Sequence, residues 1–112
     1  MMITKGQKPK YLYKILSKEN WESSQNKSIL VLSSNDEVFI HLAKEDQLQK
    51  ILDKHWNNVS NYVVLKLETN KLNGTLLYET NPGGTTKYYH LYNGKIPHSS
   101  IVDVKVVKGI KS

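Results

Sequence analysis

The stretch Tyr62-Val63-Val64-Leu65-Lys66-Leu67-Glu68 decides the fold class of this chain. Its branched and aromatic residues are typical of a β-strand. Apolar and charged residues alternate only in its second half, whereas the first half is a continuous apolar run. Strands that are covered on both faces have such runs, so we expect this strand to lie in the centre of a sheet.

Before this strand, the sequence predicts a first strand followed by a helix. Tyr11 to Leu16 is rich in aromatic and branched residues, which indicates a strand. Ser17 is a residue type that caps helices, and acidic residues follow it in the early turns of a helix from about Lys18 to Gln25. We expect Trp21 to face inward from this helix and to belong to the core.

A second strand and a longer helix are expected next. The run Val38-Phe39-Ile40-His41 predicts a buried strand. Ala43 to Trp56 predicts a helix, because its apolar residues fall on one stripe, acidic residues begin it and lysines lie near its end.

Strands dominate after the central strand. The expected strands are Thr75 to Glu79, Tyr88 to Tyr92 and Ile101 to Val107, separated by a loop rich in Gly and Pro and by a turn at Asn93-Gly94. Two early helices packed on a mostly antiparallel sheet make an α+β fold, rather than an alternating doubly wound one.

The length of the chain, 112 residues, supports one domain. We expect a flexible basic N-terminus over residues 1–9, a single α+β domain over residues 10–108 and a short tail over residues 109–112. The chain contains no cysteine, which excludes disulfides, thiolate zinc sites and cysteine nucleophiles. No apolar run approaches the roughly 20 residues that cross a bilayer, and the start lacks the apolar stretch of a secretory signal, so a cytoplasmic location is expected.

The positive charge of the chain is a weak indication of function. The net charge is +6, yet residues 19–104 carry eight lysines and ten acidic residues, a net of −2, so the excess lies at the two ends. All sixteen basic residues are lysine, whereas recognition of bases and phosphates usually recruits arginine. This pattern therefore argues against nucleic acid as a partner.

The sequence lacks the motifs of several common kinds of active site. The four histidines form neither an i,i+4 pair nor a His-x-His, so no metal is expected. The stretch Pro82-Gly83-Gly84-Thr85-Thr86-Lys87 lacks the spacing of a phosphate loop, and no Gly-x-Ser-x-Gly elbow of a serine hydrolase is present.

Four polar or aromatic residues remain as candidates for a site. His41 ends one apolar strand and Glu79 ends another, while His90 and Tyr92 share a face because they lie two positions apart in a strand. Polar side chains beside apolar runs are costly to bury without partners, so these residues are either hydrogen-bonded for structural reasons or open to a cleft. His55 is interpreted as a residue of the helix end and is left out of the site.

The order of these segments resembles the small bacterial domain-of-unknown-function family 952, from about residue 10 to residue 108. The resemblance is carried by Tyr11-Leu12-Tyr13-Lys14-Ile15, Trp21, Ser33, Glu37-Val38-Phe39-Ile40-His41, Val63-Val64-Leu65-Lys66-Leu67-Glu68, Leu77-Tyr78-Glu79 and His90-Leu91-Tyr92. The fold of that family is similar to that of ADP-ribosyltransferases, in which a split sheet binds a dinucleotide in a cleft. The resemblance therefore implies NAD or a related nucleotide as ligand or substrate.

The resemblance also implies roles for single residues. His41 would bind a ribose or act as an acid or base, and Glu79 would stabilise the positive charge that develops when the nicotinamide–ribose bond breaks. His90 and Tyr92 match the His-Leu-Tyr of the family, and the ring of Tyr92 or Tyr62 would stack on the base. Many relatives have Gly where this chain has Val38.

Two hypotheses of function thus stand side by side. The first is a nucleotide-type cleft for NAD or ADP-ribose, with an ADP-ribosyl or phosphoribosyl transferase as its catalytic form. The alternative is a non-catalytic module that keeps the fold only and binds a protein or a small ligand through its lysine-rich end strands or clustered tyrosines.

Overall fold

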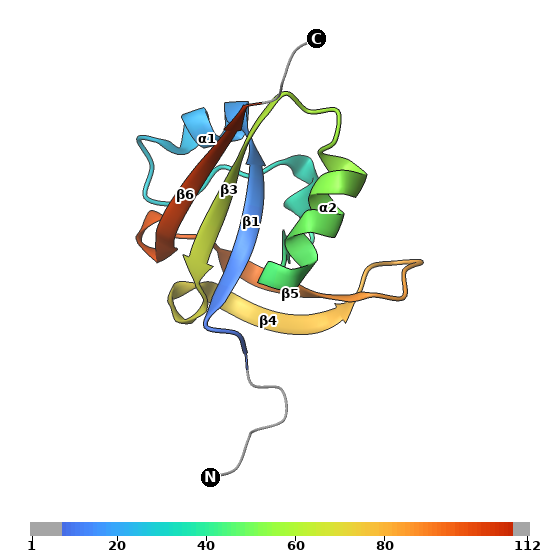
Figure 1. Ribbon diagram of the computed structural model, residues 1–112. Coiled ribbons are helices and arrows are strands. Elements are labelled where there is room, and N and C mark those ends of the chain that lie inside the picture. Colours follow the sequence, from blue (N-terminus) through green and yellow to red (C-terminus); the bar gives the residue numbers. More distant parts are fainter. Residues whose placement is uncertain (1–7, 109–112) are drawn as a thin grey trace.

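The computed structural model describes residues 8–108, which form six strands and two α-helices (Figure 1). All strand pairs are antiparallel, and the strands form two three-stranded sheets. The first sheet has the order β1 (Tyr11–Ser17), β3 (Asn61–Glu68), β6 (Ile101–Lys108), and the second has the order β2 (Ile40–Leu42), β5 (Lys87–Lys95), β4 (Asn73–Thr80). The expected α+β class is confirmed, and β3 is the central strand of its sheet as predicted.

One face of the first sheet supplies much of the core. In the register of β1 against β3, Leu12 pairs with Leu67 and Leu16 pairs with Val63. Residues that pair directly lie on the same face, and these four side chains are all buried. The alternation along β1 is the reason that only every second residue of this strand is buried.

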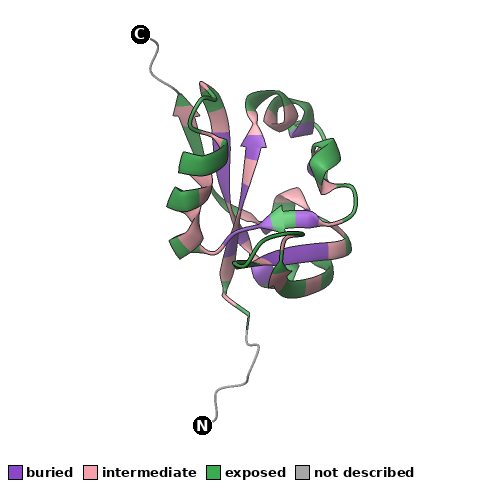
Figure 2. Cartoon of the chain, turned by 90° about the vertical axis from the view of Figure 1, so that its right-hand side faces the viewer, coloured by how far each residue is buried: buried purple, intermediate pink, exposed green. Residues whose placement is uncertain are grey.

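The second sheet completes the core from the other side. Residues 40, 42, 89 and 91 of β2 and β5 are buried in the same cluster as the core face of the first sheet. A backbone bridge between Tyr13 of β1 and Ala43 joins the two sheets. Figure 2 shows that the buried residues lie on strands of both sheets, while the helices are mainly exposed or half-buried.

The first helix, α1 (Lys18–Ser24), begins as the sequence predicts. The side chain of Ser17 accepts a hydrogen bond of 3.1 Å from the backbone N–H of Asn20, which satisfies one of the free donors at the helix start. Trp21 is half-buried and packs against the core from outside, so it contributes to the core without lying inside it.

The second helix is shorter than predicted. α2 covers Leu48–His55, whereas the stripe of apolar residues predicted a start at Ala43. The backbone N–H and C=O of Ala43 are both bonded to Tyr13, so Ala43 has an extended pairing partner and cannot join a helix. A short 3-10 turn at Glu45–Gln47 lies between this bridge and α2.

The predicted buried strand over Val38-Phe39-Ile40-His41 is wrong at its ends. Only Ile40–Leu42 pairs with β5, Val38 is 77% exposed, and His41 faces outward. The 3-10 turn at Ser34–Asp36 precedes this short strand, and the backbone N–H of His41 donates to the carboxylate of Asp36 at 3.0 Å. Because the chain is still in this turn at Asp36, the strand that follows is only three residues long.

The predicted turn at Asn93-Gly94 is also wrong, because β5 continues through it to Lys95. The pairing of β4 with β5 shifts between Asn73 and Thr75, and Asn93 takes up the irregularity with a positive φ of 52°. A Cβ atom on Gly94 would lie 1.8 Å from the carbonyl oxygen of Asn73. The two strands thus approach so closely at this bulge that no side chain fits.

Two of the expected segments lie at the ends of the chain. The expected N-terminus over residues 1–9 falls outside the described residues except for Lys8 and Pro9, and the expected tail over residues 109–112 falls outside them entirely. In the part of the chain that the structure describes, neither helix has the length and apolar character needed to cross a membrane.

Candidate functional site

The outer face of the second sheet brings together four residues that the sequence singled out. His41 of β2 and His90 of β5 are directly paired, so their rings lie on one face, and the ring centroids are 5.6 Å apart. Tyr92 follows two positions after His90 on this face, and Glu79 of β4 bonds to both. Leu91, between the two β5 residues, is buried on the core side.

His90 is the centre of a hydrogen-bond network. Its ring is completely buried, and Nδ1 lies 2.8 Å from Oε2 of Glu79 while Nε2 lies 2.8 Å from Oδ1 of Asn81. The hydroxyl of Tyr92 donates to the same Oε2 of Glu79. Both ring nitrogens are therefore used within the protein, which fixes the orientation of the imidazole.

Glu79 is held in its charged form by these contacts. The hydroxyl of Tyr92, and after it the ring of His90, lowers the pKa of Glu79, because both groups hydrogen-bond to the carboxylate. The same bond raises the pKa of Tyr92. Both contacts end on Oε2, and within residues 8–108 no hydrogen bond reaches Oε1 of this side chain, which is 36% exposed.

His41 is oriented from behind by Asp36. Nδ1 of His41 lies 3.0 Å from Oδ1 of Asp36, and 45% of the His41 side chain is exposed. Within residues 8–108, no group bonds to Nε2 of His41. A carboxylate on one ring nitrogen fixes the direction of the other, so the orientation of Nε2 is set by Asp36.

Asp36 is itself fixed by a buried lysine. Nζ of Lys14 lies 2.9 Å from both carboxylate oxygens and donates to the backbone carbonyl of His41 at 3.1 Å. Burial opposes the ionisation of Asp36, but the hydrogen bonds from His41 and the charge of Lys14 outweigh it and lower the pKa of Asp36 to about 2. Burial lowers the pKa of Lys14, and Asp36 opposes that shift.

Phe39 lies in the middle of the aromatic residues of this face. Its ring stacks on His90 with centroids 4.0 Å apart, and its centroid is 4.8 Å from that of His41 and 5.2 Å from that of Tyr92. Phe39 covers His90 and separates it from solvent. We call His41, Phe39, Glu79, His90 and Tyr92 the histidine face.

Sequence reasoning missed four residues that support this face. Phe39 was detectable, since it precedes His41 by two positions and residues two apart share a face in a strand. Asn81 was detectable in the same way from Glu79. Asp36 lies in a turn and Lys14 in the middle of an apolar strand, and neither position carries a local signal of its role.

Tyr62, the fifth predicted site residue, is not brought to the histidine face. It lies on β3 in a separate hollow of about 470 Å³ between α2 and the first sheet, where its ring is 5.3 Å from that of Trp56. Tyr89 is buried on the core side, with its ring 4.6 Å from that of Tyr78. The tyrosines therefore do not line one common pocket.

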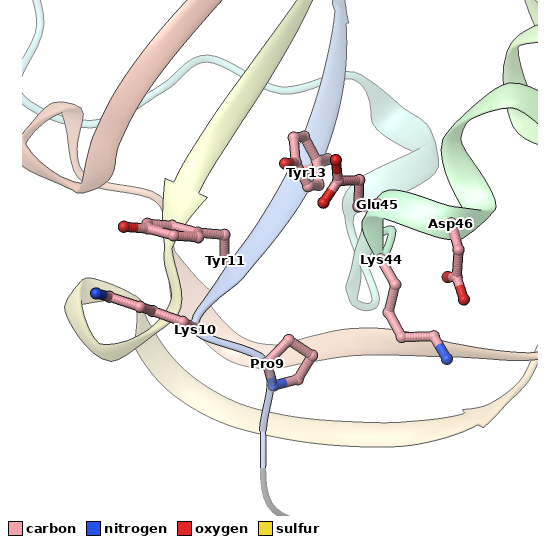
Figure 3. Close-up of a pocket in the computed structure, with 7 residues that line it drawn as sticks. All are labelled: Pro9, Lys10, Tyr11, Tyr13, Lys44, Glu45 and Asp46. Carbon is pink, nitrogen blue, oxygen red and sulfur yellow. The ribbon is translucent and has the colours of Figure 1, made fainter.

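A second hollow lies beside the start of β1 (Figure 3). Its volume is about 410 Å³, and it is lined by Pro9, Lys10, Tyr11, Tyr13, Lys44, Glu45 and Asp46. Neither this hollow nor the one beside α2 contains a residue of the histidine face. Among residues 8–108, no group of three histidine, aspartate or glutamate side chains has the arrangement to hold a metal ion.

The fold is that of a small α+β protein with two antiparallel three-stranded sheets. Residues 15–104 match the family described as "Protein of unknown function (DUF952)", and the chain belongs to this family. A comparison with curated proteins finds no significant match.

Solved structures with the same fold come from protein CC0527 of Caulobacter crescentus. Its crystal structure is 28% identical in sequence, with a TM-score of 0.73, and the match covers 86% of this chain and 84% of that one. The solution NMR structure of CC0527 gives 28% identity and a TM-score of 0.72 over 87% of this chain and 84% of that one. The family resemblance in the sequence is thereby confirmed.

Proposed function

We propose that the histidine face binds a ribose-containing nucleotide of the NAD or ADP-ribose type. The observation that carries this proposal is a pair of polar atoms on one sheet face, Nε2 of His41 and Oε1 of Glu79, that have no hydrogen-bond partner among residues 8–108. The other polar atom of each side chain is bonded within the protein. Neighbouring hydroxyls of a ribose need one acceptor and one further donor or acceptor held in fixed positions, and these two atoms supply them.

The same arrangement suits cleavage of the bond between nicotinamide and ribose. As that bond breaks, its electron pair leaves with nicotinamide and positive charge develops at the ribose C1′. The carboxylate of Glu79, held ionised by Tyr92 and His90, is the group that stabilises this charge. An acceptor then adds to C1′, so the reaction with NAD is ADP-ribosyl transfer, and with a phosphorylated ribose as donor it is phosphoribosyl transfer. His41 acts as ribose ligand or as acid or base.

One observation favours the alternative function, a binding module without catalysis. Both ring nitrogens of His90 are used within the protein, and neither hollow includes the histidine face. In that case His90, Glu79 and Tyr92 hold β4 and β5 together, and the ligand is a protein or a small molecule bound elsewhere.

A ligand titration tests nucleotide binding directly. Thermal unfolding is followed with NAD, ADP-ribose and nicotinamide, because a ligand that binds only the folded state raises the Tm. We expect ADP-ribose or NAD to raise the Tm of the unmodified chain and of His55→Ala, whose ring is exposed on α2, but not of His41→Ala. No shift at millimolar ligand, or an equal shift in His41→Ala, overturns the proposed site.

A second measurement separates catalysis from binding. Nicotinamide released from NAD is quantified for the unmodified chain and for Glu79→Gln. We expect Glu79→Gln to lose the release of nicotinamide while keeping its Tm within a few degrees. Binding without release in the unmodified chain supports the module without catalysis.

A further inference from the structure

The last strand, β6, forms an edge of the first sheet and carries an exposed apolar row. In the described chain its only strand partner is β3. Val102, Val104 and Val106 are 47%, 39% and 58% exposed, although residues 63, 64, 65 and 67 of the neighbouring strand β3 are buried. An edge strand with unpaired backbone groups and exposed apolar side chains is a template for pairing with another strand.

The row continues the core face of the first sheet beyond its covered part. Val104 pairs with Leu65 and Val106 pairs with Val63, and both β3 partners are buried in the core cluster. Because paired residues lie on the same face, the two valines point to the same side as the core residues. The apolar face of this sheet therefore extends one strand further than the elements that cover it.

The sequence of β6 is complementary to itself when it is read in the opposite direction. In an antiparallel pair of two β6 strands centred on Val104, that residue faces its own copy and Val102 faces Val106. Asp103 faces Lys105 in the same register, at two symmetry-related places. Each apolar residue thus meets an apolar one, and each charge meets the opposite charge.

The neighbouring registers lack this complementarity. A strand that pairs with its own copy about a two-fold axis is centred on one residue, so the register changes by moving the centre along the strand. Centring on Asp103 brings two carboxylates face to face, and centring on Lys105 brings two ammonium groups face to face. Like charges directly opposite each other destabilise a strand pair, which leaves the register on Val104.

We propose that this protein self-associates as a symmetric dimer, in which β6 of one copy pairs antiparallel with β6 of a second copy around Val104. The two first sheets then form one continuous six-stranded sheet. The pairing extends over Val102–Val106, and its Val102 end coincides with the bulge of β6, because Asp103 pairs with Lys66 and Ile101 pairs with Leu67. The histidine face lies on the other sheet and is not part of this contact.

Two charge substitutions provide the test, with the association state measured by sedimentation velocity over a wide concentration range. Asp103→Lys places lysine opposite lysine, and Lys105→Asp places aspartate opposite aspartate. We expect the unmodified chain to dimerise and each variant to associate about tenfold more weakly, since two symmetric pairs change from attraction to repulsion. Glu22→Lys, on the exposed side of α1, is the matched control and keeps the dimer.

An equimolar mixture of the two variants makes the test specific for this register. In a mixed pair, both charged residues of one strand are lysines and both of the other are aspartates, so every charged position again meets its opposite. We expect the mixture to recover the dimer. A monomeric unmodified chain, unchanged association in the single variants, or a mixture that stays monomeric overturns the proposal, and none of these results depends on nucleotide binding.

Discussion

The ammonium group of Lys14 lies 2.9 Å from each carboxylate oxygen of Asp36, and both side chains are almost completely buried. Lys14 belongs to the core face of β1, and Asp36 holds both the ring and the backbone N–H of His41. This one ion pair therefore connects the first sheet to the histidine of the second. The residue that orients His41 is thus held by a lysine on the core face of β1, so the candidate site and the core share this ion pair.

Removal of Lys14 is expected to destabilise the fold. Lys14→Met leaves the buried Asp36 carboxylate without its lysine partner, and such a loss costs about 3–5 kcal/mol. The double variant Lys14→Met with Asp36→Leu removes both charges and is expected to recover much of that stability. Urea unfolding measures both values, with the exposed Lys18→Met as the control. A loss below about 1 kcal/mol in Lys14→Met contradicts this account.

The stability of the protein is expected to fall in acid because of Asp36. Its pKa is lowered from 3.8 to about 2 in the folded state, so its stabilising effect is complete above the unfolded pKa and is lost as the pH falls from about 4 towards 2. The difference of roughly 2 units corresponds to about 2–3 kcal/mol. Urea midpoints between these pH values measure the loss.

The matched variants for this pH series are Asp36→Asn and Glu37→Gln. Glu37 is the exposed neighbour of Asp36. We expect Glu37→Gln to lose stability in acid to the same extent as the unmodified chain. Asp36→Asn is less stable at neutral pH and has a flatter pH profile. An equally steep profile in Asp36→Asn shows that other carboxylates cause the loss.

Tyr92→Phe is expected to raise the pKa of Glu79 towards its ordinary value. The hydroxyl of Tyr92 is the main cause of the lowered pKa of this carboxylate, and phenylalanine keeps the ring without the hydrogen bond. The carboxyl carbon of Glu79, followed by NMR during an acid titration, reports the change. Tyr88→Phe on the same strand is the control and leaves the titration in place. If both variants titrate alike, the contact with Tyr92 is absent in solution.

Gly94→Ala is expected to cost more stability than Gly83→Ala. Gly83 has a φ of +79° but open space around it. Alanine there is expected to lower the free energy of unfolding only by the strain of a left-handed backbone, about 1 kcal/mol. At Gly94 an added Cβ meets the backbone of Asn73, and one strand has to move away from the other. Chemical unfolding of the two variants compares the costs. Similar losses in both indicate that the bulge between β4 and β5 opens easily.

Much of the fold follows from patterns that are local in the sequence. β3, the capped start of α1 and the strand β6 are set by neighbouring residues, and each is found where the sequence predicts it. The errors come from partners distant in the chain. Ala43 is extended because Tyr13 pairs with it, and β5 passes through Asn93-Gly94 because Asn73 pairs with Lys95.

The residues of the candidate site likewise divide into those that a local sequence pattern predicts and those that depend on distant partners. His41, Glu79, His90 and Tyr92 were selected from strand ends and from the two-residue period, and the structure places them on one face. Tyr62 was selected as an aromatic residue alone and lies in a different hollow. Asp36 and Lys14 reach the site only through the contact between the two sheets, which no local pattern contains.

The helix α2 has no buried residue, and its apolar positions Leu48 and Leu52, together with Trp56 directly after it, line a hollow rather than the core. An element with so little buried surface opens at a lower free energy than the sheets do. Its amide hydrogens are therefore expected to exchange with solvent through a local opening, while those of β3 exchange only when the whole domain unfolds. The protein thus unfolds at two levels, locally at α2 and globally. A compound that binds in the hollow beside α2 is expected to slow amide exchange in that helix alone.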